Sequence, residues 1–104
     1  MANSTDSKVM TVLEAVVPAD QWARLQEIFR SSVDRLPAPL LHSYLVQDKN
    51  EPTRWRLISI WRSFEALREY RRSVGTHGGA LMFQAVGAEP QTSIFDILVE
   101  QEPG

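Results

Sequence analysis

Residues 54–73, RWRLISIWRSFEALREYRRS, change from the pattern of a strand to that of a helix around Ser63. Through Trp61 the residues alternate as in a strand, and after Ser63 the apolar positions recur every three or four residues. Ser63 is a typical helix N-cap, and Glu65 lies where a carboxylate interacts favourably with the helix dipole. The stretch therefore predicts a strand at 54–61 that turns directly into a helix.

The rest of the chain shows the same two patterns in alternation. We expect strands at 9–17, 40–47, 54–61 and 93–100, helices at 20–33 and from Ser63 to the glycines of GTHGG, and a short helix at 80–86 closed by Gly87. Leaving the short helix aside, the order is that of two split βαβ halves. It predicts a ferredoxin-like α+β fold, βαββαβ, with a four-stranded antiparallel sheet and helices on one face.

The composition is that of a single domain without a disulfide or thiolate-metal framework. With 104 residues the chain suffices for one core, which we place at 9–100, with flexible termini at 1–8 and 101–104. Cysteine is absent, and two histidines are too few for a histidine-rich metal site. A net charge of −2 does not favour nucleic acid or an anionic membrane. No apolar run approaches the ~20 residues that cross a bilayer, and the N-terminus lacks the apolar core of a signal peptide, so we expect a cytoplasmic protein.

The predicted strands carry apolar residues on both faces. An antiparallel sheet with one wet face should alternate apolar and polar residues, and helices can cover only one face. The surplus consists of Met10, Val12 and Val16 in the first strand, Ile58 and Ile60 in the third, and Phe95, Ile97 and Val99 in the last. We therefore expect a homodimer in which two sheets pack face to face, with a few tolerated surface aliphatics as the alternative.

LISIWRSFEALREY, residues 57–70, resembles the signature of the antibiotic biosynthesis monooxygenase-like family. The shared features are a strand ending in an aliphatic-rich run and Trp, followed by Ser, Glu-Ala-Leu and an aromatic. The helix at 20–33, the hairpin HSYLVQDKNEPTRW and the closing strand agree, so the resemblance covers residues 9–100. It implies a dimeric α+β barrel built by sheet-to-sheet packing, with a cavity between sheet and helices in each subunit.

The resemblance also implies a class of chemistry. The family includes cofactor-independent monooxygenases of polycyclic phenols or anthrones, quinol oxygenases, haem-degrading enzymes and proteins without demonstrated activity. We therefore expect a monooxygenase that needs no cofactor and brings a phenol, quinol or anthrone-like substrate together with dioxygen. The alternative is a non-catalytic dimeric barrel that binds a small apolar ligand.

The haem-degrading branch of the family resembles this chain least. That branch uses an asparagine on the first strand, a second tryptophan in the second helix and a histidine farther along. Strand 9–17 contains no asparagine, Tyr70 stands where the tryptophan is expected, and His77 falls a few residues short of the histidine. The resemblance therefore disfavours haem as a cofactor.

Trp61 and His77 each have a structural and a functional interpretation. Trp61, at the end of a central strand, is first a packing residue that holds the strand-to-helix corner, and the same corner could form a wall of a substrate pocket. His77 lies in the loop GTHGG, where a histidine could take a proton from a phenol or an anthrone carbon. Its structural interpretation is an exposed loop residue.

His42 and Tyr44 lie two residues apart and therefore share one face of strand 40–47. If that face looks toward the helices, they line the cavity with a base and a phenol donor. If it looks toward a partner, they are interface residues. Periodicity alone leaves both possibilities open.

Tyr70 and Arg71 lie on or near the buried side of the second helix, where a guanidinium could bind a substrate oxyanion. A run of arginines on a helix is more often a solvated face. The candidate catalytic bases are thus His77 and His42, and the candidate substrate contacts are Tyr44, Trp61, Tyr70 and Arg71. We expect neither a metal site nor a bound cofactor.

Overall fold

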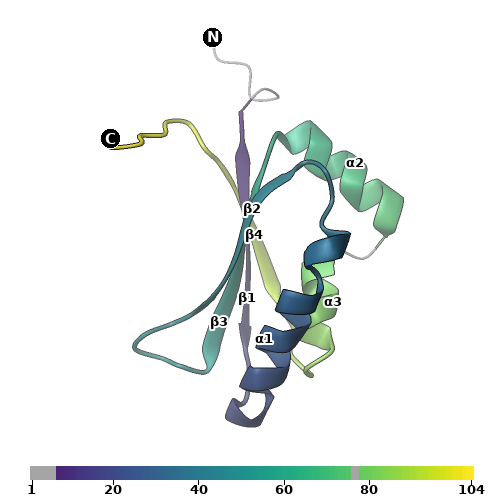
Figure 1. Cartoon of the computed structure of the whole chain (residues 1–104), viewed down its shortest axis with the longest axis vertical. Coiled ribbons are helices and arrows are strands. Elements are labelled where there is room, and N and C mark those ends of the chain that lie inside the picture. Colours follow the sequence, from purple (N-terminus) through teal and green to yellow (C-terminus); the bar gives the residue numbers. More distant parts are fainter. Residues whose placement is uncertain (1–6, 76–77) are drawn as a thin grey trace.

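The computed structural model describes residues 7–75 and 78–104 and contains one four-stranded antiparallel sheet (Figure 1). Its strands are β1 (Val9–Val16), β2 (Leu40–Gln47), β3 (Arg54–Trp61) and β4 (Gln91–Asp96). The spatial order β2-β3-β1-β4 places the first and third strands in the centre. The predicted ferredoxin-like α+β fold is confirmed.

Three α-helices lie on one side of the sheet, as Figure 1 shows. They are α1 (Trp22–Ser31), α2 (Phe64–Val74) and α3 (Gly78–Gln84). Short 3₁₀ turns at Ala19–Gln21 and Val33–Arg35 flank α1, so the predicted helix at 20–33 is divided into three pieces. Ser63 caps α2 as expected, because its hydroxyl accepts a hydrogen bond from the Ala66 N–H at 3.1 Å.

The third helix is shifted toward the N-terminus relative to its predicted range of 80–86. It is closed by Gly87, which adopts a φ of 79°. Gly87 N–H bonds to the Gln84 carbonyl and Ala88 N–H to the Phe83 carbonyl, each at 3.0 Å, which is the hydrogen-bond pair of a Schellman motif. Glycine is suited to this position because the left-handed conformation costs it no Cβ clash.

The prediction that the last strand spans 93–100 was wrong at both ends. β4 pairs only with β1, from Gln91 opposite Glu14 to Asp96 opposite Val9, and β1 begins at Val9. Beyond this pairing, the Ile97 N–H still donates one hydrogen bond to the carbonyl of Lys8, the residue just before β1. The last residues therefore leave the sheet, and Leu98 and Val99 are about 80% exposed.

The core lies between the sheet and the helices. Alternate residues of β1 and β3 are buried on this side, since the register sets Val9 opposite Trp61 and Leu13 opposite Leu57. One cluster joins these strands to Leu25 of α1 and to Met82 and Phe83 of α3. A second, smaller cluster joins Val9, Trp61 and Leu67 of α2.

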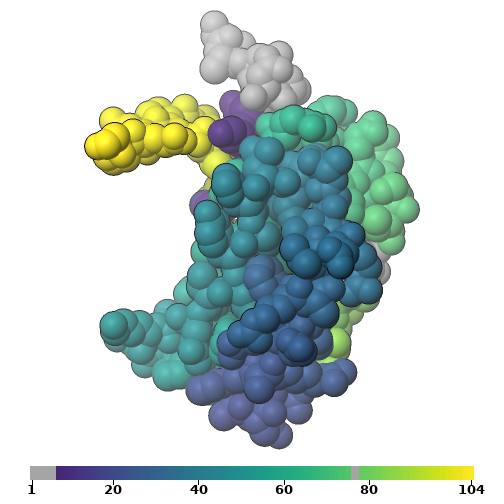
Figure 2. All heavy atoms as spheres, in the orientation of Figure 1, coloured from purple at the N-terminus to yellow at the C-terminus, as the bar shows by residue number. Residues whose placement is uncertain are grey.

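The opposite face of the sheet carries no helix among the described residues. Figure 2 shows this side hollowed between the C-terminal segment and the β2–β3 loop. Toward one end the face is apolar, because the register brings together Met10, Val12, Tyr44, Ile58, Ile60 and Phe95. We call this set the open-face patch.

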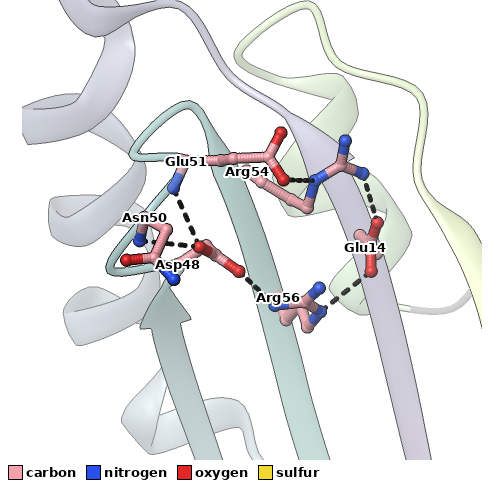
Figure 3. A network of polar contacts seen from close by, with 6 residues as sticks. All are labelled: Glu14, Asp48, Asn50, Glu51, Arg54 and Arg56. Atoms are coloured by element: carbon pink, nitrogen blue, oxygen red, sulfur yellow. Dashed lines mark hydrogen bonds and ion pairs between the residues drawn. The ribbon is translucent and has the colours of Figure 1, made fainter.

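The other end of the same face is charged (Figure 3). Arg54 and Arg56 both donate to Glu14, Arg56 at 2.8 Å, and Arg56 also reaches Asp48 at 3.3 Å. These bonds hold the pKa of the Glu14 carboxyl below its ordinary value of 4.5. The Glu51 and Asn50 backbone N–H groups lower the pKa of Asp48 in the same way.

No helix in the described part of the chain is both long and apolar enough to cross a membrane.

We expect Glu14→Gln to lower the free energy of unfolding near neutral pH and to have less effect in acid. The folded-state pKa of Glu14 is depressed, so its stabilisation is present above 4.5 and is lost as pH falls through the folded value. Urea unfolding at about pH 7 and about pH 3 measures this difference. Glu27→Gln is the control, because its ion pair with Arg30 is exposed and 3.8 Å long, so that its loss should change the stability little. An equal loss for Glu14→Gln at both pH values would contradict the role given to its charge.

Candidate functional site

A cavity of about 340 Å³ lies between the sheet and the helices, within the size range of small-molecule sites. Its walls come from the end of α1 and the following turn, from β2 and β3, and from α2 and α3. Most lining residues are apolar, and they include Ile28, Phe29, Leu36, Leu40, Leu57, Trp61 and Met82. Among the described residues, the polar ones that line it are Ser32, Arg35, Ser43, Ser59 and Tyr70.

Trp61 forms part of the wall and also anchors the core. It is 2% exposed, and its indole N–H donates to the Thr11 hydroxyl at 3.0 Å across the sheet. The ring of Tyr70 lies 5.3 Å from that of Trp61, centre to centre, at 32°. The structural and the functional interpretation of Trp61 are therefore compatible, because one face of a packed tryptophan can border a cavity.

The Tyr70 hydroxyl lies close to the first residue of α3. It accepts a hydrogen bond from the Gly78 N–H at 3.4 Å, and a Cβ at Gly78 would stand 3.2 Å from the same oxygen. Glycine at this position thus lets the backbone approach the phenol. His77, which directly precedes Gly78 in the sequence, lies outside the described residues.

Ser43 and Ser59 form a hydroxyl pair on the cavity side of the sheet. They are cross-strand neighbours in the β2–β3 register, and their oxygens are 3.3 Å apart. One of the two hydroxyls must act as acceptor in this pair, which leaves its own O–H to donate elsewhere. Sequence reasoning missed both serines, because serine is common on solvated strand faces and only the register shows that Ser59 is buried.

His42 and Tyr44 lie on the face of the sheet opposite the helices. His42 is paired with Ile60 and Tyr44 with Ile58, so both side chains belong to the open side, where their rings stack at 6.3 Å and 13°. Tyr44 does not line the cavity. Of the two possibilities that the sequence leaves open, the structure therefore places His42 and Tyr44 on the face turned away from the helices and not in the cavity.

His42 instead borders a second hollow of about 410 Å³ at the outer edge of β2. This outer hollow adjoins the cavity and shares Phe29, Ser32, Leu36, Leu40 and Ser43 with it. A bulge in the β2–β3 pairing between Leu40 and His42 lies at this point. The edge of β2 therefore separates an inner and an outer space.

Arg71 is half-buried and does not line the cavity, whereas Arg35 does. Sequence reasoning missed Arg35, because it lies in a 3₁₀ turn where the helical pattern had already ended. No group of three or more metal-ligating side chains occurs within residues 7–75 and 78–104. The described lining thus offers hydroxyls and one guanidinium in an apolar chamber.

Several solved structures share this fold at low sequence identity. A protein provisionally named an antibiotic biosynthesis monooxygenase from Deinococcus radiodurans superposes with a TM-score of 0.70 at 11% identity, over 92% of this chain and 98% of that one. SnoaB, a cofactor-independent oxygenase from Streptomyces nogalater, superposes with a TM-score of 0.65 at 16% sequence identity. The match covers 94% of this chain and 99% of SnoaB. A protein of unknown function from Nitrosomonas europaea superposes with a TM-score of 0.68 at 13% sequence identity, over 96% of this chain and 98% of that one.

Neither a protein-family model nor a curated protein matches the sequence. The resemblance read from residues 57–70 is confirmed as a likeness of fold, which the chain shares over nine-tenths of its length. A shared fold at such identities does not by itself assign an activity.

Proposed function

We propose that this chain is a cofactor-independent monooxygenase that binds a small aromatic substrate in the cavity between sheet and helices. The observation that carries the proposal is the cavity itself, which is closed on the sheet side by Trp61 and lined mainly by apolar side chains. SnoaB, named a cofactor-independent oxygenase, shares the fold that forms this chamber. A cytoplasmic location belongs to the same proposal.

The reaction would use the electrons of the substrate. A base removes the hydroxyl proton of a phenol or quinol, or a proton of the reactive CH₂ of an anthrone. The resulting anion carries carbanion character at the reactive carbon, which reduces dioxygen and combines with it. Return of the proton gives a hydroperoxide, and loss of water leaves a carbonyl. For an anthrone the balance is one CH₂ and one O₂ converted to one C=O and one H₂O, so no external reductant is consumed.

The protein would contribute a base, donors for the oxyanion and the exclusion of water. His77 is the proposed base, since it directly precedes Gly78 and Gly79, which line the cavity. His42 is the second candidate, from the outer hollow. The free O–H of the Ser43–Ser59 pair is the proposed donor to the substrate oxygen as charge develops on it. Tyr70, which lines the same cavity, is the second candidate for contact with that oxygen.

A second copy of the chain would cover the open face of the sheet, giving the homodimer that the sequence pattern favours. The open-face patch joins large apolar side chains from all four strands, and Tyr44 and Phe95 are each about half exposed. Burying such a patch against its own symmetry mate satisfies it without any other partner. Tyr44 would then be an interface residue.

We expect the unmodified protein to sediment as a dimer at micromolar concentration and Ile58→Lys to shift it toward the monomer. A lysine in the centre of an apolar interface leaves a buried charge without a partner. Val74→Lys, at an exposed apolar position near the end of α2, is the matched control and should remain dimeric. A monomeric unmodified protein, or a dimer unaffected by Ile58→Lys, would show that this face is not the interface.

The alternative is a barrel that binds a small apolar ligand without reaction. It is favoured by one observation: the cavity lining contains no histidine or carboxylate among residues 7–75 and 78–104. The two functions differ in whether the bound molecule reacts with dioxygen. They agree on where the aromatic ligand binds.

Oxygen consumption by the purified protein with anthrone, a hydroquinone and a naphthol tests the proposal. We expect uptake without added cofactor, and His77→Ala should lower kcat/KM by about 10²–10⁴-fold, the usual contribution of a general base. His42→Ala is measured beside it, because a loss of activity in that variant and not in His77→Ala would make His42 the base.

The assay is also run with added haem and a reductant, and three results would contradict parts of the proposal. Uptake only in the presence of haem would contradict a cofactor-independent reaction. Binding of the aromatic compounds without any oxygen uptake would instead support the non-catalytic barrel. Equal activity of His77→Ala and the unmodified protein would remove His77 as the base.

A further inference from the structure

The charged side chains that border the cavity and the outer hollow are all cationic or basic. Arg35 lines the cavity, and Arg30 and His42 line the outer hollow, while no Asp or Glu of the described chain lines either. The whole chain has no such bias, with 13 Asp and Glu residues against 11 Lys and Arg residues and two histidines. The basic border is therefore a local feature of this site and does not follow from the overall charge.

Arg35 differs from the other arginines near a hollow or on the open face. Arg30 pairs with Glu27, and Arg54 and Arg56 pair with Glu14. No ion pair of Arg35 occurs within the described residues. Its guanidinium is a fixed positive charge with five N–H donors, of which a carboxylate can accept two in parallel.

The turn that carries Arg35 places it at the rim of the cavity. Arg35 N–H bonds to the Ser32 carbonyl at 2.9 Å to close the 3₁₀ turn, and the chain then becomes extended at Leu36. The residue is exposed to solvent and yet lines the chamber. The hydroxyls of Ser43 and Ser59 lie on the sheet side of the same space, and apolar side chains such as Phe29 and Met82 line it as well.

We propose that the ligand of this cavity is an aromatic acid, with its ring system against the apolar walls and its carboxylate on the Arg35 guanidinium at the rim. The inference rests on the proposed use of the cavity as the binding site and adds the chemical class of the ligand. A planar hydrocarbon body matches the apolar walls, and the carboxylate neutralises a cation that has no ion pair within residues 7–75 and 78–104. The carboxylate stays near solvent, so its desolvation is incomplete.

The pair 9-anthracenecarboxylate and 9-anthracenecarboxamide tests this, because the two differ in charge and hardly in shape. Fluorescence titration of the full chain at neutral pH and low salt gives both dissociation constants. We expect the acid to bind about tenfold more tightly than the amide, as a charge-assisted hydrogen bond at a solvated rim provides. Added sodium chloride should weaken binding of the acid and leave the amide unchanged.

Arg35→Gln should abolish the preference for the acid while binding of the amide persists. Arg24→Gln, at an exposed arginine of α1 that lines neither hollow, is the matched control and should keep the preference. Equal urea midpoints for the two variants show that neither change acts through folding.

Three results would overturn the inference, and they differ in what else they affect. Equal binding of acid and amide to the unmodified protein rejects the aromatic acid and leaves the cavity as a binding site. A preference that survives Arg35→Gln rejects Arg35 as the recognising residue. Failure of both probes to bind rejects the cavity as an aromatic site, and with it the binding step of the proposed function. Oxygen uptake with anthrone, which carries no carboxylate, tests catalysis separately from recognition of a carboxylate by Arg35.

Discussion

The antiparallel register of β1 against β3 determines which side chains face the helices and which face the open side. Eight consecutive pairs run from Val9 opposite Trp61 to Val16 opposite Arg54. A slip of one residue would move the whole inward-facing set of one strand to the opposite face of the sheet. The observed register buries Thr11 within hydrogen-bonding distance of the Trp61 indole and sets Glu14 outward against Arg56. The core, the cavity wall and the outer ion pairs all depend on this pairing.

The cavity exists because the helices cover the sheet incompletely. α1 and α3 pack with β1 and β3 around Phe83, and α2 packs over Trp61 through Leu67. The space between these two clusters is bordered by β2 and by the turn that follows α1. It is a chamber with a wall from the rigid sheet and a rim from a loop, an arrangement in which binding residues are commonly found.

Strong local signals made much of the fold predictable. The strands at 40–47 and 54–61 agree with the structure because polar turns and the Ser63 cap bound them. The end of β4 was missed because it depends on where its partner β1 begins, which lies about 90 residues away in the sequence. The helix predicted at 20–33 was too long at its C-terminal end, because Val33 continues the apolar spacing but belongs to a 3₁₀ turn.

The candidate site was less predictable than the fold. A two-residue period shows that His42 and Tyr44 share a face, but only the pairing with Ile60 and Ile58 shows which face it is. Trp61 and Tyr70 were identified because large aromatics near a corner are rarely solvated. Arg35 and the Ser43–Ser59 pair carry no local signal, because their positions at the cavity arise from tertiary packing.

The central claim is that an aromatic ligand binds on the helix side of the sheet and not on the open side. Methyl NMR of the labelled protein during titration with anthraquinone, the oxygenated counterpart of anthrone, distinguishes the two faces directly. We predict shifts for the methyl groups of Ile28, Leu57 and Met82, which line the cavity. Shifts confined to Met10, Val12 and Ile58 of the open-face patch, or no shifts at all, would contradict it.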